Sequence, residues 1–212
     1  MLESVAKHCS QITIEHKRLI VSIGAGRAET EMNSNDLCIC LDKDKKSLYS
    51  CAFARKYLMK SKSPLVFGQY NMKDGGIIKL LKSIKMVTKL PLQILFQHPS
   101  PSQTNENRSV LQSTFIECIK AQREELVERI HFVYDSTPDN VRGTSWKTTE
   151  LYDMVHGICL NDTQHSLTTP FIISNKTDTY VNHPLFGKTE RRGWASMKKG
   201  VEMSFSVSYK LN

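Results

Sequence analysis

The chain has 212 residues, of which 40% are hydrophobic and 24% are charged, and its formal net charge is +8. This composition is that of a globular protein, and the length suits one domain spanning residues 1–212. No stretch approaches the roughly 20 apolar residues of a membrane-spanning helix, and residues 1–10 lack the apolar core of a signal peptide. These features exclude a membrane-spanning helix and indicate a cytoplasmic or nuclear location.

Strands and helices alternate through the first two thirds of the chain. Short apolar runs rich in β-branched residues predict strands at 18–23, 37–41, 64–67, 92–96 and 130–134. Apolar residues at three- and four-residue spacing predict helices at 44–61, 76–88, 106–127 and 148–157. Parallel strands joined by crossover helices form a doubly wound sheet, which binds ligands beyond the carboxyl ends of its strands.

The pattern changes in the last third of the chain. Strands are predicted at 171–173 and 203–211 with no long helix between them, so they form an antiparallel hairpin that closes the sheet. The segment 174–202 is expected to be a basic loop at the ligand-binding edge. The predicted fold is therefore α/β, with a doubly wound, mostly parallel seven-stranded sheet and a C-terminal antiparallel hairpin.

A glycine-rich turn, Gly24-Ala25-Gly26, follows the first predicted strand directly. Gly24 permits a tight turn, and Gly26 lets the backbone approach a ligand with no Cβ in the way. Ala28 is expected within the start of a following helix. A plain turn is the alternative, but the position after a buried strand favours a nucleotide-type cofactor bound by Gly24, Ala25 and Gly26.

Asp42 ends the second predicted strand. A carboxylate at this position can accept hydrogen bonds from both hydroxyls of a ribose, whether the ribose belongs to S-adenosylmethionine or to NAD. The alternative is an N-cap for the helix expected to begin near Asp44.

Five β/α steps followed by a closing antiparallel hairpin resemble the class I, Rossmann-like S-adenosylmethionine-dependent methyltransferases, over essentially the whole chain. The resemblance implies S-adenosylmethionine as the cofactor. It also implies that the loop after the third strand faces the adenine, with Asn71 near the adenine amine and Met72 against the ring. Dehydrogenases usually close with further parallel strands, which disfavours NAD-linked chemistry.

The fourth predicted strand ends in Gln97-His98-Pro99-Ser100. This segment resembles in shape the D/N-P-P-Y/F motif of methyltransferases that act on nucleobase nitrogens. The resemblance implies that Gln97 and His98 lie at the methyl-transfer point and that Pro99 and Ser100 contact the acceptor. His98 could act as a base, because its ordinary pKa lies near neutrality, or it could only bind backbone at the strand end.

Positive charge is concentrated in two segments. Residues 43–89 contain twelve lysines and arginines against Asp44 and Asp74, a local balance of +10. In the segment 174–202, Arg191 and Arg192 precede Trp194, and basic residues around an aromatic ring can bind phosphates while stacking a base. We therefore predict an RNA partner contacted by these three residues. A solvated, lysine-rich surface is the alternative.

The six cysteines form no CxxC pair, and no histidine spacing matches a zinc site. Buried reduced thiols and no metal are therefore expected. The preferred hypothesis is methyl transfer to RNA, either a cap or a tRNA base. A methyltransferase of a small molecule or protein remains open, as does an inactive Rossmann-like scaffold, because the usual carboxylate is missing from Gln97-His98-Pro99-Ser100.

Overall fold

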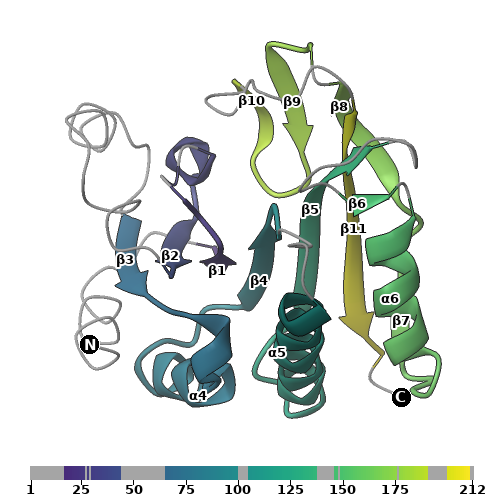
Figure 1. Ribbon diagram of the computed structural model, residues 1–212. Helices are drawn as coiled ribbons and strands as arrows, with labels where there is room; N and C mark the ends of the chain where they lie inside the picture. Colours follow the sequence, from purple (N-terminus) through teal and green to yellow (C-terminus); the bar gives the residue numbers. More distant parts are fainter. Residues whose placement is uncertain are drawn as a thin grey trace.

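A nine-stranded mixed sheet organises the protein (Figure 1). The computed structural model describes residues 17–26, 28, 30–43, 65–99, 105–137, 146–147, 149–175, 177–190 and 200–210. The helix predicted at 44–61 and the site residues Ser100, Arg191, Arg192 and Trp194 lie outside the described residues.

Five parallel strands form one half of the sheet, in the order β3-β2-β1-β4-β5. Their bounds are β1 Leu19–Ile23, β2 Leu37–Asp42, β3 Leu65–Gln69, β4 Leu92–Gln97 and β5 Arg129–Thr137. The strand order reverses between β1 and β4, and such a switch point opens a crevice at the carboxyl edge of the sheet. The predicted parallel half and its strand-order switch are confirmed, but the described sheet has nine strands rather than the seven expected.

Antiparallel strands complete the sheet. β11 (Val201–Tyr209) runs antiparallel to β5 and lies between β5 and β7 (His165–Leu167). β8 (Phe171–Asn175) also pairs with β11, and the two-residue strand β6 (Trp146–Lys147) pairs with β5. The predicted closing hairpin is therefore present as β8 and β11.

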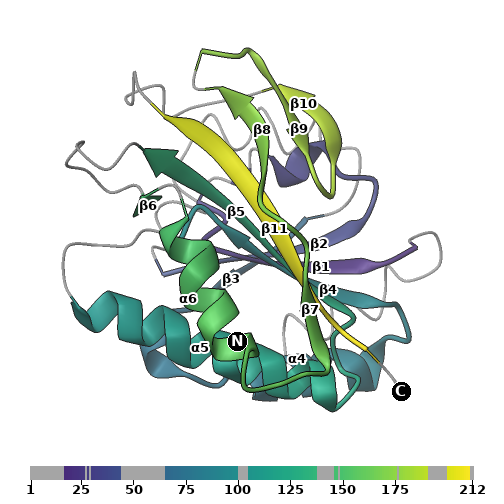
Figure 2. The ribbon, with the colours of Figure 1, turned by 90° about the vertical axis from the view of Figure 1, so that its right-hand side faces the viewer.

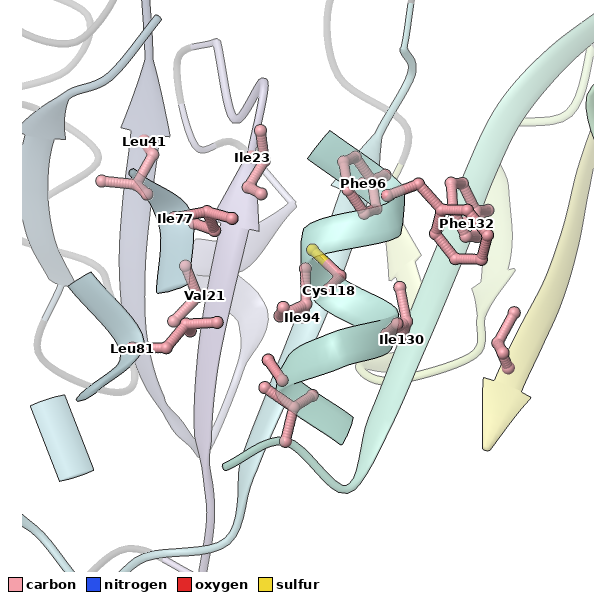
Figure 3. Packing of buried hydrophobic residues seen from close by; sticks show 14 of the residues in the cluster. Val21, Ile23, Leu41, Ile77, Leu81, Ile94, Phe96, Cys118, Ile130 and Phe132 are labelled. Atoms are coloured by element: carbon pink, nitrogen blue, oxygen red, sulfur yellow. The ribbon is translucent and has the colours of Figure 1, made fainter. Parts of the chain in front are cut away.

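Among the described residues, three helices cover one face of the sheet, namely α4 (Ile77–Val87), α5 (Asn105–Arg123) and α6 (Glu150–Cys159) (Figure 2). Beneath them, Phe96, Phe132 and Phe205 are register partners on β4, β5 and β11. The Phe96 and Phe132 rings stack with centroids 4.7 Å apart (Figure 3), and the Phe132 and Phe205 rings stack with centroids 4.8 Å apart. Aromatic pairs of this kind add to the stability gained from burying their apolar area.

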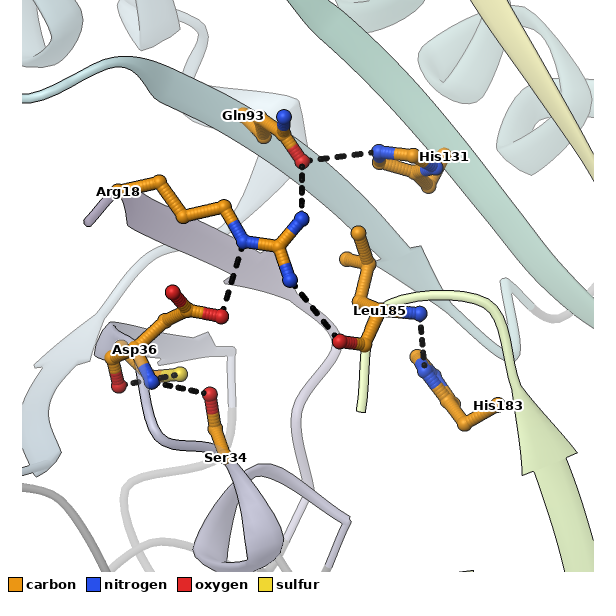
Figure 4. A network of polar contacts seen from close by, with 8 residues as sticks. Arg18, Ser34, Asp36, Gln93, His131, His183 and Leu185 are labelled. Atoms are coloured by element: carbon orange, nitrogen blue, oxygen red, sulfur yellow. Dashed lines mark hydrogen bonds and ion pairs between the residues drawn. The ribbon is translucent and has the colours of Figure 1, made fainter. Parts of the chain in front are cut away.

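A β-hairpin packs on the opposite face. It consists of β9 (Tyr180–His183) and β10 (Gly187–Glu190), and Leu185 at its turn joins a second apolar cluster with Ile20 and Leu95. Arg18, just before β1, donates a hydrogen bond to the Leu185 carbonyl oxygen at 3.0 Å (Figure 4). The segment 174–202, expected to be a loop, thus contains a small sheet that covers the face of β1 and β4.

The connection from β1 to β2 differs from the prediction. Ala28 has a φ of 53°, outside the helical range, and the described residues between the strands form only the 3₁₀ turn η1 (Glu31–Asn33). The helix expected around Ala28 is therefore wrong. The apolar face that such a helix would cover is filled in part by Leu185 instead.

Cys38, Cys40, Cys118 and Cys159 are buried and free, as expected of reduced thiols. None of the described helices combines the length and hydrophobicity needed to cross a membrane.

Candidate cofactor and acceptor site

The glycine turn after β1 adopts the conformation that its sequence predicts. Gly24 and Gly26 have φ values of 75° and 56°, in the left-handed region that favours glycine. The Gly24 and Ala25 backbone N–H groups both donate to the Leu41 carbonyl oxygen, at 2.9 Å and 3.1 Å. These bonds hold the turn against the end of β2.

Asp42 lies beside this turn. Its Oδ2 accepts a hydrogen bond from the Gly26 N–H at 3.0 Å, although the two residues are 16 positions apart. The neighbouring loop is held here as well, because the Tyr70 N–H donates to the Asp42 carbonyl oxygen at 2.9 Å. The structure therefore brings together the glycine turn, Asp42 and the loop after β3, as a ribose site at this edge requires.

Replacement of Gly24 by alanine should destabilise the protein by about 1–3 kcal/mol, since alanine is strained in this backbone conformation. A Cβ at Gly24 would also lie only 3.0 Å from the Gln97 carbonyl oxygen. The matched control is Gly157→Ala inside α6, where a Cβ meets nothing within 4 Å and should stabilise by about 0.5–1 kcal/mol. Urea unfolding measures both, and equal effects would contradict the assigned strain.

Asn71 and Met72, predicted to contact adenine, begin the 3₁₀ turn η2 (Met72–Asp74). The Asn71 Oδ1 accepts from the Lys73 N–H at 3.2 Å and so caps this turn. Met72 is partly buried and packs against the main hydrophobic core. Both residues thus have structural contacts, and their role toward a cofactor stays a prediction.

Gln97, at the end of β4, is buried under the β9–β10 hairpin. Its Oε1 lies 3.4 Å from His183 Nε2, while His183 Nδ1 accepts from the Leu185 N–H at 3.1 Å. Because Nδ1 is an acceptor, the proton of the neutral ring belongs on Nε2, which donates to Gln97. The hairpin turn is therefore attached directly to the carboxyl end of β4.

His98 follows immediately and turns its ring toward two carboxylates. Its Nδ1 lies 3.4 Å from Asp135 Oδ1 on β5, and its Nε2 lies 3.1 Å from Glu202 Oε1 on β11. His98 has a φ of 46°, a conformation that costs a non-glycine residue about 1–2 kcal/mol. The carboxyl edge thus carries a strained histidine between two acidic residues.

These contacts determine the charge of His98. Burial lowers the pKa of this imidazole, but the contacts with Asp135 and Glu202 raise it more, to about 9. The ring is then protonated at neutral pH and cannot accept a further proton. A base role for His98 therefore requires that it first lose the proton held by these carboxylates.

Pro99 is held by Trp146 on β6. Its carbonyl oxygen accepts a hydrogen bond from Trp146 Nε1 at 2.6 Å, and Trp146 is only 1% exposed. Arg108 lies over the ring at 5.4 Å and pairs with Glu150.

The sequence did not single out Asp135, Glu202 or His183 as site residues. Asp135 stands near the end of a predicted strand, which is a positional signal for the carboxyl edge. Glu202 reaches the same edge only because β11 runs antiparallel to β5, and His183 only because the hairpin folds back over β4. Local sequence patterns do not contain these two long-range contacts.

Comparison with known proteins gives structural matches only. No protein-family model and no curated protein sequence matches this chain. A solved antibiotic-related methyltransferase is 12% identical, with a TM-score of 0.55 over 99% of this chain and 94% of that one. An rRNA methylase from Streptococcus thermophilus is 8% identical, with a TM-score of 0.48 over 98% of this chain and 95% of that one, too low to support an argument.

The strand order and the first of these matches agree on the architecture. β11 inserted antiparallel beside β5 ends the parallel sheet, as the sequence predicts for a methyltransferase fold. At 12% identity the match establishes the fold and nothing about the reaction. This chain therefore has the Rossmann-like fold of a class I methyltransferase.

Proposed function

We propose that this protein is an S-adenosylmethionine-dependent methyltransferase whose acceptor is RNA. The main support is the contact between the glycine turn after β1 and the Asp42 carboxylate, whose Oδ2 lies 3.0 Å from the Gly26 nitrogen. This contact lies at the switch point of a methyltransferase fold. A carboxylate held there by a backbone N–H is oriented before a ribose arrives, which lowers the cost of binding.

The connection between β1 and β2, as far as its residues are described, favours S-adenosylmethionine over NAD. Dinucleotide-binding folds place the pyrophosphate at the N-terminus of the helix that follows this turn. Between β1 and β2, the described residues provide only the 3₁₀ turn at Glu31–Asn33 and the buried Glu31 carboxylate. S-adenosylmethionine has no phosphate, so it does not need the helix.

The acceptor is proposed to bind at the turn after β4. Gln97 and His98 would lie at the methyl-transfer point, and Pro99 and Ser100 would contact the acceptor. Gln97 and His98 lie at the same edge of the sheet as the glycine turn, because a Cβ at Gly24 would contact the Gln97 carbonyl oxygen. The support for RNA is the net charge of +8 and the basic segments at 43–89 and 188–199.

Transfer of a labelled methyl group from S-adenosylmethionine tests the reaction. We expect label to enter RNA rather than protein or small-molecule acceptors. Label in a protein or in a small molecule would show that RNA is not the acceptor. No transfer to any acceptor, despite tight S-adenosylmethionine binding, would instead support an inactive scaffold with a retained cofactor site.

RNA binding should weaken steeply with salt. Each phosphate neutralised contributes about 0.7 to the logarithmic slope for single strands, so replacing Arg191 and Arg192 together by alanine should flatten the slope by about 1–2. Trp194→Ala should weaken binding with little change in slope, because stacking releases few ions. Fluorescence anisotropy with a short RNA measures both, and Lys210→Ala, outside these segments, is the matched control. A wild-type protein that binds no RNA at low salt contradicts the RNA proposal.

A further inference from the structure

Two like charges face each other across the β5–β11 pair. Asp135 and Glu202 are direct register partners on antiparallel strands, so their side chains project from the same face of the sheet. Such a pair destabilises a sheet unless a cation lies between the carboxylates. His98, from the end of β4, lies against both carboxylates, with Nδ1 facing Asp135 and Nε2 facing Glu202, and it offers one of these nitrogens as a third donor.

We propose that His98, Asp135 and Glu202 form a binding site for a first-row divalent metal ion, with Zn²⁺ and Mn²⁺ as the probes. One donor atom from each residue lies within 4.8 Å of the other two. In a tetrahedral site, ligands that each lie about 2.1 Å from the ion are about 3.4 Å apart. Donors up to 4.8 Å apart must therefore close by about 1–1.5 Å, which requires rotation of the side chains.

The donor types suit such an ion. Imidazole nitrogen is a common ligand of zinc and iron, whereas carboxylate oxygen also suits manganese. Calcium and magnesium prefer sites made of oxygen alone, so the histidine selects against them. The three donors come from the ends of three neighbouring strands, which gives the site a rigid support.

A supporting hydrogen bond orients one ligand. Ser174 Oγ on β8 donates to Glu202 Oε2 at 2.6 Å, and this bond directs Oε1 toward His98. The His98 backbone is fixed as well, since its N–H donates to the Val133 carbonyl oxygen at 2.7 Å. Hydrogen bonds that orient metal ligands typically change metal affinity by about 10–100-fold when removed.

Three protein ligands leave coordination positions open to water or to an oxygen of a bound molecule. The side chains are 34%, 27% and 11% exposed for His98, Asp135 and Glu202, so a small ion can reach the site from solvent. Phosphate and hydroxyl oxygens are the ligands that such positions would take. Metal uptake by these residues does not depend on the proposed methyl transfer.

Equilibrium dialysis of the full chain, stripped with a chelator and then exposed to ZnCl₂ or MnCl₂, tests the site. Wild type should take up about one equivalent, and Asp135→Asn and Glu202→Gln should each weaken binding at least tenfold. Ser174→Ala should weaken it by about 10–100-fold through Glu202. The matched control is Asp162→Asn, which should leave metal uptake unchanged. Asp162 lies elsewhere in the protein, and its Oδ2 is 2.7 Å from His165 Nδ1.

Two results would overturn the proposal. One is a wild type that takes up neither metal, which would leave protonated His98 as the cation between the carboxylates. The other is uptake that persists in the Asp135→Asn/Glu202→Gln double variant. Circular dichroism checks that the variants fold. Calorimetry with S-adenosylmethionine separates a failed metal site from a failed cofactor site.

Discussion

Lowering the pH from about 6.5 toward 4 should destabilise this protein steeply, because two buried histidines remain neutral in the folded state. His131 and His183 are only 4% and 3% exposed. Burial lowers the pKa of each to about 3, with a further contribution from Arg129 and Arg18 at His131 and from His98 and His131 at His183. Both rings belong to the network of polar contacts in Figure 4, where His131 Nε2 lies 3.1 Å from Gln93 Oε1 and His183 Nδ1 accepts from the Leu185 N–H.

The direction follows from proton uptake. In the unfolded chain both histidines titrate near about 6.5, so between that pH and about 3 the unfolded state binds up to two more protons than the folded state. Stability contributed by the neutral rings is therefore present above pH 6.5 and is lost as the pH falls. Two protons correspond to a slope of about 2.7 kcal/mol per pH unit in the middle of this range.

Urea unfolding at several pH values between 7 and 4 measures this slope. His131→Gln and His183→Gln should each remove about half of it, whatever their effect on stability at pH 7. His156→Gln is the matched control, because His156 is exposed on α6 and should leave the slope unchanged. If all three variants keep the wild-type slope, acid sensitivity does not arise from His131 and His183.

Removal of the Asp42 carboxylate should weaken S-adenosylmethionine binding at least tenfold. Charge-assisted hydrogen bonds contribute about 1.5–3 kcal/mol each, and the proposed ribose contact has two of them. Asp42→Ala removes the charge and the acceptor of the Gly26 N–H, whereas Asp42→Asn keeps an acceptor of the same shape. Both variants should bind weakly, with asparagine the milder.

Asp153→Asn provides the control for this prediction, because Asp153 is an exposed carboxylate on α6, away from the glycine turn. Isothermal titration calorimetry gives the affinities, and thermal unfolding checks that the fold persists. An Asp42→Ala protein that binds S-adenosylmethionine as tightly as wild type would show that Asp42 does not hold the ribose.

The part of the site that sequence could predict depends on local patterns. A buried strand that ends in Gly24-Ala25-Gly26 and a second strand that ends in Asp42 imply a shared edge once the strands are parallel, and the structure confirms this. The five parallel strands were predictable for the same reason, since uninterrupted apolar runs indicate strands buried on both faces, whereas the short strands β6, β7, β9 and β10 were not predicted.

The rest depends on contacts between distant segments. The Asp135–Glu202 pair requires the register of β11 on β5, and the Gln97–His183 contact requires the hairpin to cross the sheet. The helix after β1 was expected because most parallel connections contain one, whereas here Leu185 covers part of that face.

Calorimetric titration of the wild-type protein with S-adenosylmethionine, S-adenosylhomocysteine and NAD, in parallel, tests the central claim most directly. The proposed site binds an adenosine ribose through Asp42 and has no described helix N-terminus after β1 for a pyrophosphate. We therefore predict binding of S-adenosylmethionine and S-adenosylhomocysteine and at least tenfold weaker binding of NAD. Tight binding of NAD with none of S-adenosylmethionine would contradict the account.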